Sequence, residues 1–271
     1  MVGGRNIISL PDETHFIMAQ IIAIVNQKGG VGKTTTAVNL GAYLARLGKF
    51  VMLVDMDPQA NATSGLGIDH RTLGKGVYET LAGTSAFRDV IVSTAVQGYR
   101  VAPATVSLAG ANVELVNVDR REYRLYDALL EVRNDFDYIL IDCPPSLGLL
   151  TINSLVAADQ VFIPVQAEYY ALEGLGQLLE TIKLVQDNLR PELKILGAAI
   201  TMYDSRVGLS DAILNELYKY FPNKIFRSVI PRNIRLAEAP SHGLSILQYD
   251  AKSKGAHAYE RLAREIIDYK I

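Results

Sequence analysis

The chain has 271 residues, of which 49% are apolar and 21% charged, and its formal net charge is −2 at pH 7. A chain of this length can bury roughly 75% of its unfolded surface, so we expect a folded globular protein and not a disordered one. Its one cysteine, Cys143, excludes an internal disulfide and a metal site made of several cysteines. No apolar run approaches the roughly 18 residues that a membrane-spanning helix needs, so we expect a cytoplasmic protein.

The predicted elements begin after residues 1–17, which lack the pattern of a secretory signal and which we expect to form a flexible extension. From residue 18 to residue 271 we expect one domain. Short apolar runs alternate there with longer stretches of helical periodicity. In chain order, the predicted strands span residues 21–26, 50–55, 99–103, 138–142, 160–165, 194–201 and 225–230. The predicted helices span residues 33–47, 170–188, 210–220 and 256–269.

Several predicted strands are almost continuous in isoleucine, valine and leucine, which is typical of parallel strands covered by helices on both faces. The alternation of strands and helices predicts an α/β fold with a single doubly wound, mostly parallel sheet. Ligands of such sheets bind at the carboxyl ends of the strands. The arginine-rich stretch 120–133 fits an exposed helix or a groove for a partner, and we expect the helix.

A glycine-rich loop lies between the first predicted strand and the first predicted helix. It reads Gln27-Lys28-Gly29-Gly30-Val31-Gly32-Lys33-Thr34-Thr35. Glycines let backbone N–H groups converge on phosphate oxygens, and the helix N-terminus adds donors and partial positive charge. Lys33 can neutralise the β and γ phosphates, and the Thr34 hydroxyl can ligate Mg²⁺. Residues 28–35 are therefore the predicted ligands of ATP or ADP with Mg²⁺.

The loop departs from the usual GxxxxGK[ST] pattern, because Gln27 stands where glycine is usual and a second lysine, Lys28, lies inside it. This variant, KGGVGKTT, is the deviant Walker A signature, and the sequence resembles the ParA/Soj-type chromosome partitioning ATPases. The resemblance continues through LVDMDPQANATSGLG (53–67), DYILIDCPPSLGLLTINSL (137–155), PVQAEYYALEGL (164–175) and VIPRNIRLAEAPSHG (229–243). The loop specifies only the wider superfamily, and the later segments narrow the resemblance to the partitioning branch.

Acidic residues close two of the predicted strands. Asp55 and Asp57 follow the strand 50–55, and Asp142 ends the strand 138–142 in the manner of a Walker B aspartate. A magnesium nucleotide needs carboxylates held near its γ-phosphate. We assign Asp142 to the Mg²⁺ shell, through water, and Asp57 to the attacking water, as the resemblance also implies. Asp55 fits a turn or capping residue better.

The predicted metal-site residues are thus Thr34, Asp57 and Asp142, and the predicted catalytic residues are Lys28, Lys33 and Asp57. The resemblance implies that Lys28 crosses a dimer interface to the partner's nucleotide, so that ATP joins two copies and hydrolysis releases them. It also implies that Met202, Pro231 and Asn233 line the adenine pocket, although each of them fits a structural role as well.

Positive charge is concentrated in the last third of the chain. Residues 1–189 carry 14 Lys+Arg against 20 Asp+Glu, whereas residues 190–271 carry 13 against 9. The resemblance places a DNA surface in this basic part, at Arg206, Arg235 and Lys252. No helix-turn-helix or zinc-finger pattern accompanies them in the sequence, so we expect nonspecific phosphate contacts. Charge considered without the resemblance favours a solvated basic face.

The resemblance implies an ATPase of DNA segregation, cytoplasmic and nucleoid-associated. Its expected partners are a second copy of the chain, nonspecific double-stranded DNA and a ParB-like centromere-binding protein that stimulates hydrolysis. The main alternative is a MinD-type membrane-cycling ATPase. Such a protein needs a C-terminal amphipathic helix with a basic face, and the sequence ends inside its last predicted helix, so we expect no membrane partner.

Two further alternatives share the loop. An iron-sulfur carrier related to nitrogenase reductase bridges its cluster with paired cysteines from each copy, which the lone Cys143 cannot supply. A metabolic ligase would show a site for a small-molecule acid, and we find no motif for one.

Overall fold

The computed structural model describes residues 18–168, 174–204 and 211–269. In this part of the chain one sheet contains seven strands in the order β3-β4-β2-β5-β1-β6-β7. All neighbouring strands are parallel except β3 and β4, which are antiparallel. The strands are β1 Gln20–Ile24, β2 Val51–Asp55, β3 Val92–Ser93, β4 Tyr99–Ala102, β5 Tyr138–Asp142, β6 Gln160–Gln166 and β7 Lys194–Thr201. The predicted doubly wound sheet is confirmed, and the short β3 is an element that the sequence analysis missed.

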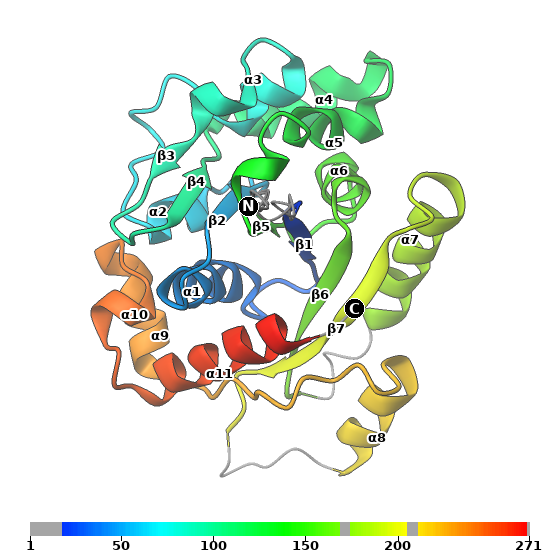
Figure 1. Ribbon diagram of the computed structural model, residues 1–271. Helices are drawn as coiled ribbons and strands as arrows, with labels where there is room; N and C mark the ends of the chain where they lie inside the picture. Colours follow the sequence, from blue (N-terminus) through cyan, green and yellow to red (C-terminus); the bar gives the residue numbers. More distant parts are fainter. Residues whose placement is uncertain (1–17, 169–173, 205–210, 270–271) are drawn as a thin grey trace, which may run out of the picture.

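Helices cover both faces of the sheet. Figure 1 shows α1 and α9–α11 on one side of it and α3–α6 on the other. Each side has its own hydrophobic core, and both cores include side chains from the central strands. The helices are α1 Lys33–Arg46, α2 Asn61–Gly65, α3 Val77–Ala82, α4 Ala111–Glu114, α5 Arg124–Leu129, α6 Leu149–Ala157, α7 Leu175–Asn188, α8 Asp211–Tyr220, α9 Ile234–Glu238, α10 Ile246–Tyr249 and α11 Lys254–Asp268.

The predicted helices agree with α1, α7, α8 and α11, with ends that differ by a few residues. The predicted start of α7 at residue 170 lies outside the described residues. Gly48 follows α1 with a φ of 86°, the left-handed conformation common after a helix. The stretch 120–133 is helical only in part, because α5 is short and lies between two 3₁₀ turns. Leu125 and Leu129 of α5 are buried, so one face of this short helix packs into the core and the helix is not the exposed one that we expected.

The predicted strand 225–230 was wrong. Phe226 donates a backbone hydrogen bond to Ala198 of β7, and Ile230 donates one to Ile200, both at 2.9 Å. Between these two contacts, the N–H groups of residues 227 and 228 turn away from the sheet. They donate instead to the carboxylate of Glu265 on α11, at 2.7 and 3.0 Å. The segment therefore follows β7 without forming a continuous ladder.

The strand register brings the predicted acidic residues together. β2 and β5 are neighbours, and Asp55 at the end of β2 is directly opposite Asp142 at the end of β5. β1 lies on the other side of β5, with Ile24 opposite Asp142, so the loop that follows β1 begins beside the same carboxylate. The carboxyl ends of these three strands thus place the glycine loop and the acidic residues at one edge of the sheet.

Candidate functional site

The glycine loop connects β1 to α1 and is anchored at its first residues. The Asn26 side chain donates to the Pro164 carbonyl at 2.7 Å and accepts the Lys28 N–H at 3.0 Å. Gly30 and Gly32 have φ angles of 75° and 89°, which favour glycine. A Cβ atom built on Gly29 or Gly30 would meet no atom within 4 Å. The loop therefore curves around open space, as a phosphate cradle requires.

Lys33 lies inside this loop and is 94% buried, with an exposed fraction of 6%. Its ammonium donates to the Lys28 carbonyl oxygen at 3.1 Å, which holds the side chain along the inner surface of the loop. Burial lowers the pKa of Lys33, while the charges of Asp142 and Asp57 act in the opposite direction. Because the Lys33 side chain already has a fixed position, it can pair with a phosphate without losing conformational freedom on binding.

Two adjoining cavities meet at the loop. The larger, of about 670 Å³, is lined by most of the loop and by Asp57, and Thr34 and Thr35 of α1 also face it. The smaller, of about 250 Å³, is lined by Pro231 and Asn233. Gly32, Thr35 and Met202 line both. The residues predicted to contact phosphate and those predicted to contact adenine therefore line two cavities that share a wall, although they are almost 200 residues apart in the chain.

The two carboxylates at the strand ends differ in their partners. Asp142 is fully buried, and neither of its oxygens has a hydrogen-bond partner in the described part of the chain. Asp55 is equally buried but accepts three hydrogen bonds, from the Asp57 N–H at 3.2 Å and from the Thr63 N–H and hydroxyl at 2.8 and 2.7 Å. A buried carboxylate without donors is costly unless a ligand completes it. Asp142 is therefore the carboxylate that can hold a metal ion.

The pKa values of Asp142 and Asp55 agree with this difference in hydrogen-bond donors. Burial and, after it, the charge of Asp55 raise the pKa of Asp142 well above its usual value. The Thr34 hydroxyl opposes the rise, although it does not reach hydrogen-bonding geometry. Burial raises the pKa of Asp55 only to about 6, because the hydrogen bonds from Thr63 favour its charged form. A divalent cation beside Asp142 would reverse these shifts.

Asp57 lies on the loop that follows β2 and faces the larger cavity. One of its carboxylate oxygens accepts the Gln59 N–H at 3.0 Å. Its side chain therefore has a fixed direction and stays close to the space that the phosphates would fill. Gln59, Asn61 and Ser64 also line the cavity. The sequence analysis did not single them out, although they belong to the DPQANATSG segment that carries the family resemblance.

The residues of the site fit a magnesium nucleotide. The loop backbone and the start of α1 offer donors for phosphate oxygens. Lys33 supplies a buried positive charge, and Thr34, which lines the larger cavity, offers an oxygen ligand of the kind that Mg²⁺ prefers. Asp142 offers carboxylate oxygens, although it is fully buried and does not itself line the cavity. The smaller cavity adds apolar walls from Ile230, Pro231 and Leu236. The unpartnered oxygens of Asp142 are the strongest sign that a cation belongs here.

Lys28 has a different position from Lys33. It does not line either cavity, its side chain is 34% exposed, and its ammonium lies 4.0 Å from Glu168. Its ammonium thus lies beside Glu168 and not in the nucleotide space of its own copy. An ion pair this long and this exposed contributes little to stability, so the side chain is free to find another partner.

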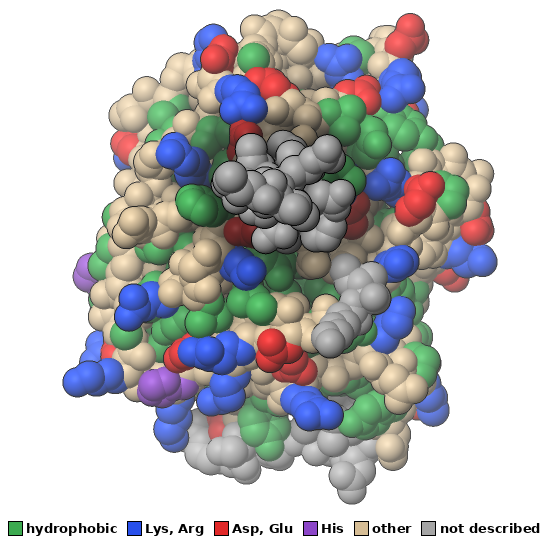
Figure 2. All heavy atoms as spheres, in the orientation of Figure 1, with side chains coloured by type: hydrophobic (Ala, Val, Ile, Leu, Met, Phe, Trp, Pro, Cys, Tyr) green, Lys and Arg blue, Asp and Glu red, His purple; other side chains and the backbone are tan. Residues whose placement is uncertain are grey.

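The three predicted DNA contacts are not equivalent. Arg206 lies outside the described residues. Arg235 forms ion pairs with Glu238 at 2.9 Å and with Asp250 at 3.6 Å, so its charge is already balanced within the chain. Lys252 is exposed, and only its backbone N–H bonds to Asp250. On the face shown in Figure 2, basic and acidic side chains are interspersed.

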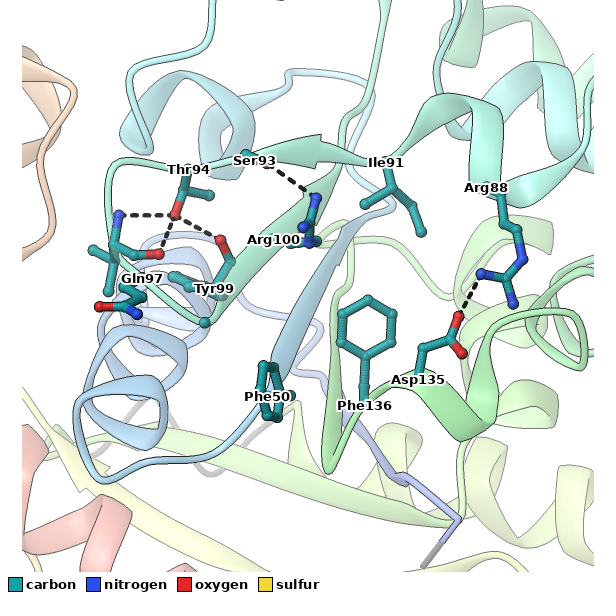
Figure 3. Close-up of a pocket in the computed structure, with 12 residues that line it drawn as sticks. Phe50, Arg88, Ile91, Ser93, Thr94, Gln97, Tyr99, Arg100, Asp135 and Phe136 are labelled. Carbon is teal, nitrogen blue, oxygen red and sulfur yellow. Dashed lines mark hydrogen bonds and ion pairs between the residues drawn. The ribbon is translucent and has the colours of Figure 1, made fainter. Parts of the chain in front are cut away.

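A separate hollow of about 560 Å³ lies at the amino ends of β2, β4 and β5. Figure 3 shows that its arginines already have partners in the chain, since Arg88 pairs with Asp135 at 2.7 Å and Arg100 donates to Ser93 at 3.0 Å. It lies at the end of the sheet opposite to the glycine loop. Ligands of doubly wound sheets bind at the carboxyl ends, so we place the functional site at the loop.

Cys143 follows Asp142 and is fully buried. Burial raises the pKa of its thiol to about 12 from a usual value of 9.0, which lowers the thiolate fraction near pH 8 about a thousandfold. We expect a thiol reagent to label the native protein at least a thousandfold more slowly than the protein unfolded in guanidinium. The single cysteine makes the absorbance change directly quantitative. Equal rates in both states would contradict the packing role of Cys143.

None of the helices in the described part of the chain has the length and apolar character needed to cross a bilayer.

Comparison with known proteins agrees with the geometry. A family model described as an AAA domain matches residues 19–195. The sporulation initiation inhibitor protein Soj of Bacillus subtilis is 57% identical, over 92% of this chain and 98% of its own length. The chromosome-partitioning ATPase Soj of Treponema pallidum is 52% identical over the same shares. A solved structure from Mycobacterium smegmatis, described as cobyrinic acid a,c-diamide synthase with bound ADP and magnesium, has a TM-score of 0.82 and 41% identity, over 92% of this chain and 94% of that one.

Proposed function

Because this chain belongs to the ParA/Soj family of chromosome-partitioning ATPases, we propose that ATP joins two copies of it and that the pair binds double-stranded DNA without sequence preference. Hydrolysis of ATP to ADP and phosphate separates the copies and releases the DNA. A ParB-like centromere-binding protein stimulates that step. The protein is an ATPase of DNA segregation, with ATP or ADP and Mg²⁺ as its cofactors, and we place it on the nucleoid.

Each part of the site has a task in this reaction. The loop backbone and Lys33 bind the phosphates, and Thr34 and Asp142 would hold a Mg²⁺ ion, whose chemistry is to neutralise phosphate charge. Asp57 orients the attacking water and accepts its proton. Met202, Pro231 and Asn233 enclose the adenine. Phosphoryl transfer asks a protein mainly for positioning and charge neutralisation, which these fixed side chains provide.

The observation that supports pairing is the position of Lys28. Among the described residues, its ammonium has only the long contact to Glu168, and it lies outside its own nucleotide cavity. A second copy that faces this surface would offer a triphosphate to the lysine. The Lys28 ammonium is attracted more strongly to ATP than to ADP, because ADP lacks the negative γ-phosphate. ATP therefore favours the paired state.

The test is light scattering coupled to size exclusion, with the purified protein in ADP and in ATP. The Asp57→Ala variant slows turnover and keeps ATP bound during the run. We expect a monomer in ADP and a dimer in ATP, and we expect duplex DNA of arbitrary sequence to migrate with the dimer only. A monomer in both nucleotides would overturn the proposal, and binding to liposomes in ATP would support the MinD-type alternative instead.

DNA affinity should depend on salt. The logarithm of the DNA association constant falls as the logarithm of salt concentration rises, and each neutralised phosphate makes this slope steeper by about 0.9. Because each copy contributes Lys252, the Lys252→Ala variant should lower the slope of the dimer by about 1.8. The measurement is fluorescence anisotropy of a labelled duplex between low and moderate salt. The matched control is Lys75→Ala, which removes another exposed lysine and should leave the slope unchanged. An unchanged slope in Lys252→Ala would remove this residue from the DNA surface.

A further inference from the structure

We propose that Thr63 is a positioning residue for ATP hydrolysis, because its hydroxyl and the buried Asp55 hold the loop that carries Asp57. The inference rests on the proposed role of Asp57. It assigns a task to Asp55, which the sequence pattern left as a turn residue, and to a threonine that the sequence analysis did not single out.

The contacts form a continuous buried chain. The Asp57 N–H donates to one oxygen of Asp55, at 3.2 Å. The other oxygen of Asp55 accepts both the N–H and the hydroxyl of Thr63, at 2.8 and 2.7 Å. The Thr63 hydroxyl then accepts the Ala104 N–H at 3.1 Å. Asp55, Thr63 and Ala104 are all fully buried, so water cannot replace any partner that is lost.

These contacts join three separate segments at the carboxyl edge of the sheet. Asp55 ends β2, Thr63 belongs to α2, and Ala104 follows β4. The Pro103 carbonyl, next to Ala104, accepts the Val77 N–H at 2.9 Å and so adds the start of α3. The Thr63 hydroxyl is the point at which these connections meet. The loop from Asp57 to α2 is therefore fixed at both of its ends.

The same loop contains a backbone conformation that needs support. Ala60 precedes α2, is fully buried and has a φ of 54°, in the left-handed region that residues other than glycine rarely adopt. Such a residue persists only where its surroundings hold it, and it is common near active sites. Its N–H donates to the Asp57 carbonyl at 2.9 Å. The strained residue is thus bonded to Asp57 and followed directly by the helix that Thr63 anchors.

The contrast with Asp142 gives Asp55 its task. The two carboxylates are opposite each other in the register. Asp142 has no donor among the described residues, whereas each oxygen of Asp55 already has a donor. Buried carboxylate oxygens need hydrogen-bond donors or a cation. Protein donors occupy the oxygens of Asp55, which leaves it a structural role, whereas the oxygens of Asp142 are open to a ligand. Asp55 therefore acts through Asp57 and does not contact the nucleotide itself.

Three variants test the proposal through phosphate release at saturating ATP and through the Kd of a fluorescent ATP analogue. Thr63→Val keeps the shape of the side chain but removes its hydroxyl, and should lower kcat tenfold or more with an unchanged Kd. Thr63→Ser keeps the hydroxyl and should retain kcat within a factor of about two. Asp55→Asn cannot accept on both sides, because its amide group is a donor, and should lower kcat like Thr63→Val.

A double variant separates positioning from general structure. If Thr63 acts through Asp57, adding Thr63→Val to Asp57→Ala should lower kcat no further, whereas an independent effect would multiply. Normal kcat in both Thr63→Val and Asp55→Asn, with Asp57→Ala inactive, would overturn this inference and leave the proposed function intact. Normal kcat in Asp57→Ala would instead refute the role of Asp57. If Thr63→Val does not fold, the Asp55→Asn and Thr63→Ser results decide.

Discussion

The Asp57→Ala variant is expected to hydrolyse ATP between about a hundredfold and ten-thousandfold more slowly than the natural protein, the range typical for the loss of a group that handles a proton. Asp57 faces the phosphate cavity, and its carboxylate is held in one direction by the Gln59 N–H. ATP affinity should change little, because Lys33 and the loop backbone remain. Phosphate release and equilibrium titration with a fluorescent ATP analogue measure the two quantities separately.

The control for this variant is Asp69→Ala, which removes a carboxylate that is exposed and paired with Arg71 on the surface. Its hydrolysis rate should equal that of the natural protein. If Asp57→Ala retained a normal rate, another group would have to handle the water. If ATP affinity fell together with the rate, Asp57 would belong to the metal shell that was also predicted for it.

The Lys28→Ala variant is expected to lose ATP-dependent pairing, with a dimer Kd at least a hundredfold higher, while each monomer still binds nucleotide. The reason is that Lys28 lies outside its own cavity, so in the proposed dimer it would meet the triphosphate of the other copy. A hundredfold change corresponds to about 2.8 kcal/mol for each dimer, which two charged contacts of about 1.4 kcal/mol each would supply. Sedimentation equilibrium in ATP measures it.

The matched control is Lys194→Ala, because Lys194 is an exposed lysine at the amino end of β7, on the opposite edge of the sheet. Pairing should be normal in this variant. The Lys28→Gln variant, which keeps most of the length of the side chain and removes its charge, should behave like Lys28→Ala. Dimers of normal affinity in both Lys28 variants would show that the lysine does not act across an interface.

Signals that lie close together in the chain predicted most of the site. The glycine loop lies directly between the strand and the helix that position it. The order strand, loop, helix in the sequence therefore predicts the arrangement that phosphate binding requires. The strands that end in Asp55 and Asp142 were predicted for the same reason, because an apolar run and its closing residue are neighbours. Their pairing in one register follows from the fold class, in which such strands share an edge.

Contacts between distant residues could not be predicted in this way. The segment 225–230 has the composition of a strand, but Glu265 takes two of its N–H groups, and nothing within the segment signals that contact. Likewise the sequence separates Asp142, assigned to the Mg²⁺ shell, from Asp55, assigned to a turn or cap, but it does not name the partner of Asp55. Only the folded chain shows that Thr63 donates to Asp55. The family resemblance implied a DNA contact at Arg235, and nothing near it in the sequence signals that Glu238 and Asp250 balance its charge in the structure.

The contact of Glu265 with residues 227 and 228 has a consequence for solubility. Unpaired strand edges recruit strands from other molecules and so promote aggregation. Along β7, the chain from Lys224 to Ile230 occupies part of the outer edge, and Glu265 satisfies N–H groups that would otherwise remain free beside it. At the other edge, β3 has only two residues, which is too short to template a new strand. Copies of the chain brought close together, as the proposed binding to one DNA molecule would bring them, can therefore crowd without their sheets joining edge to edge.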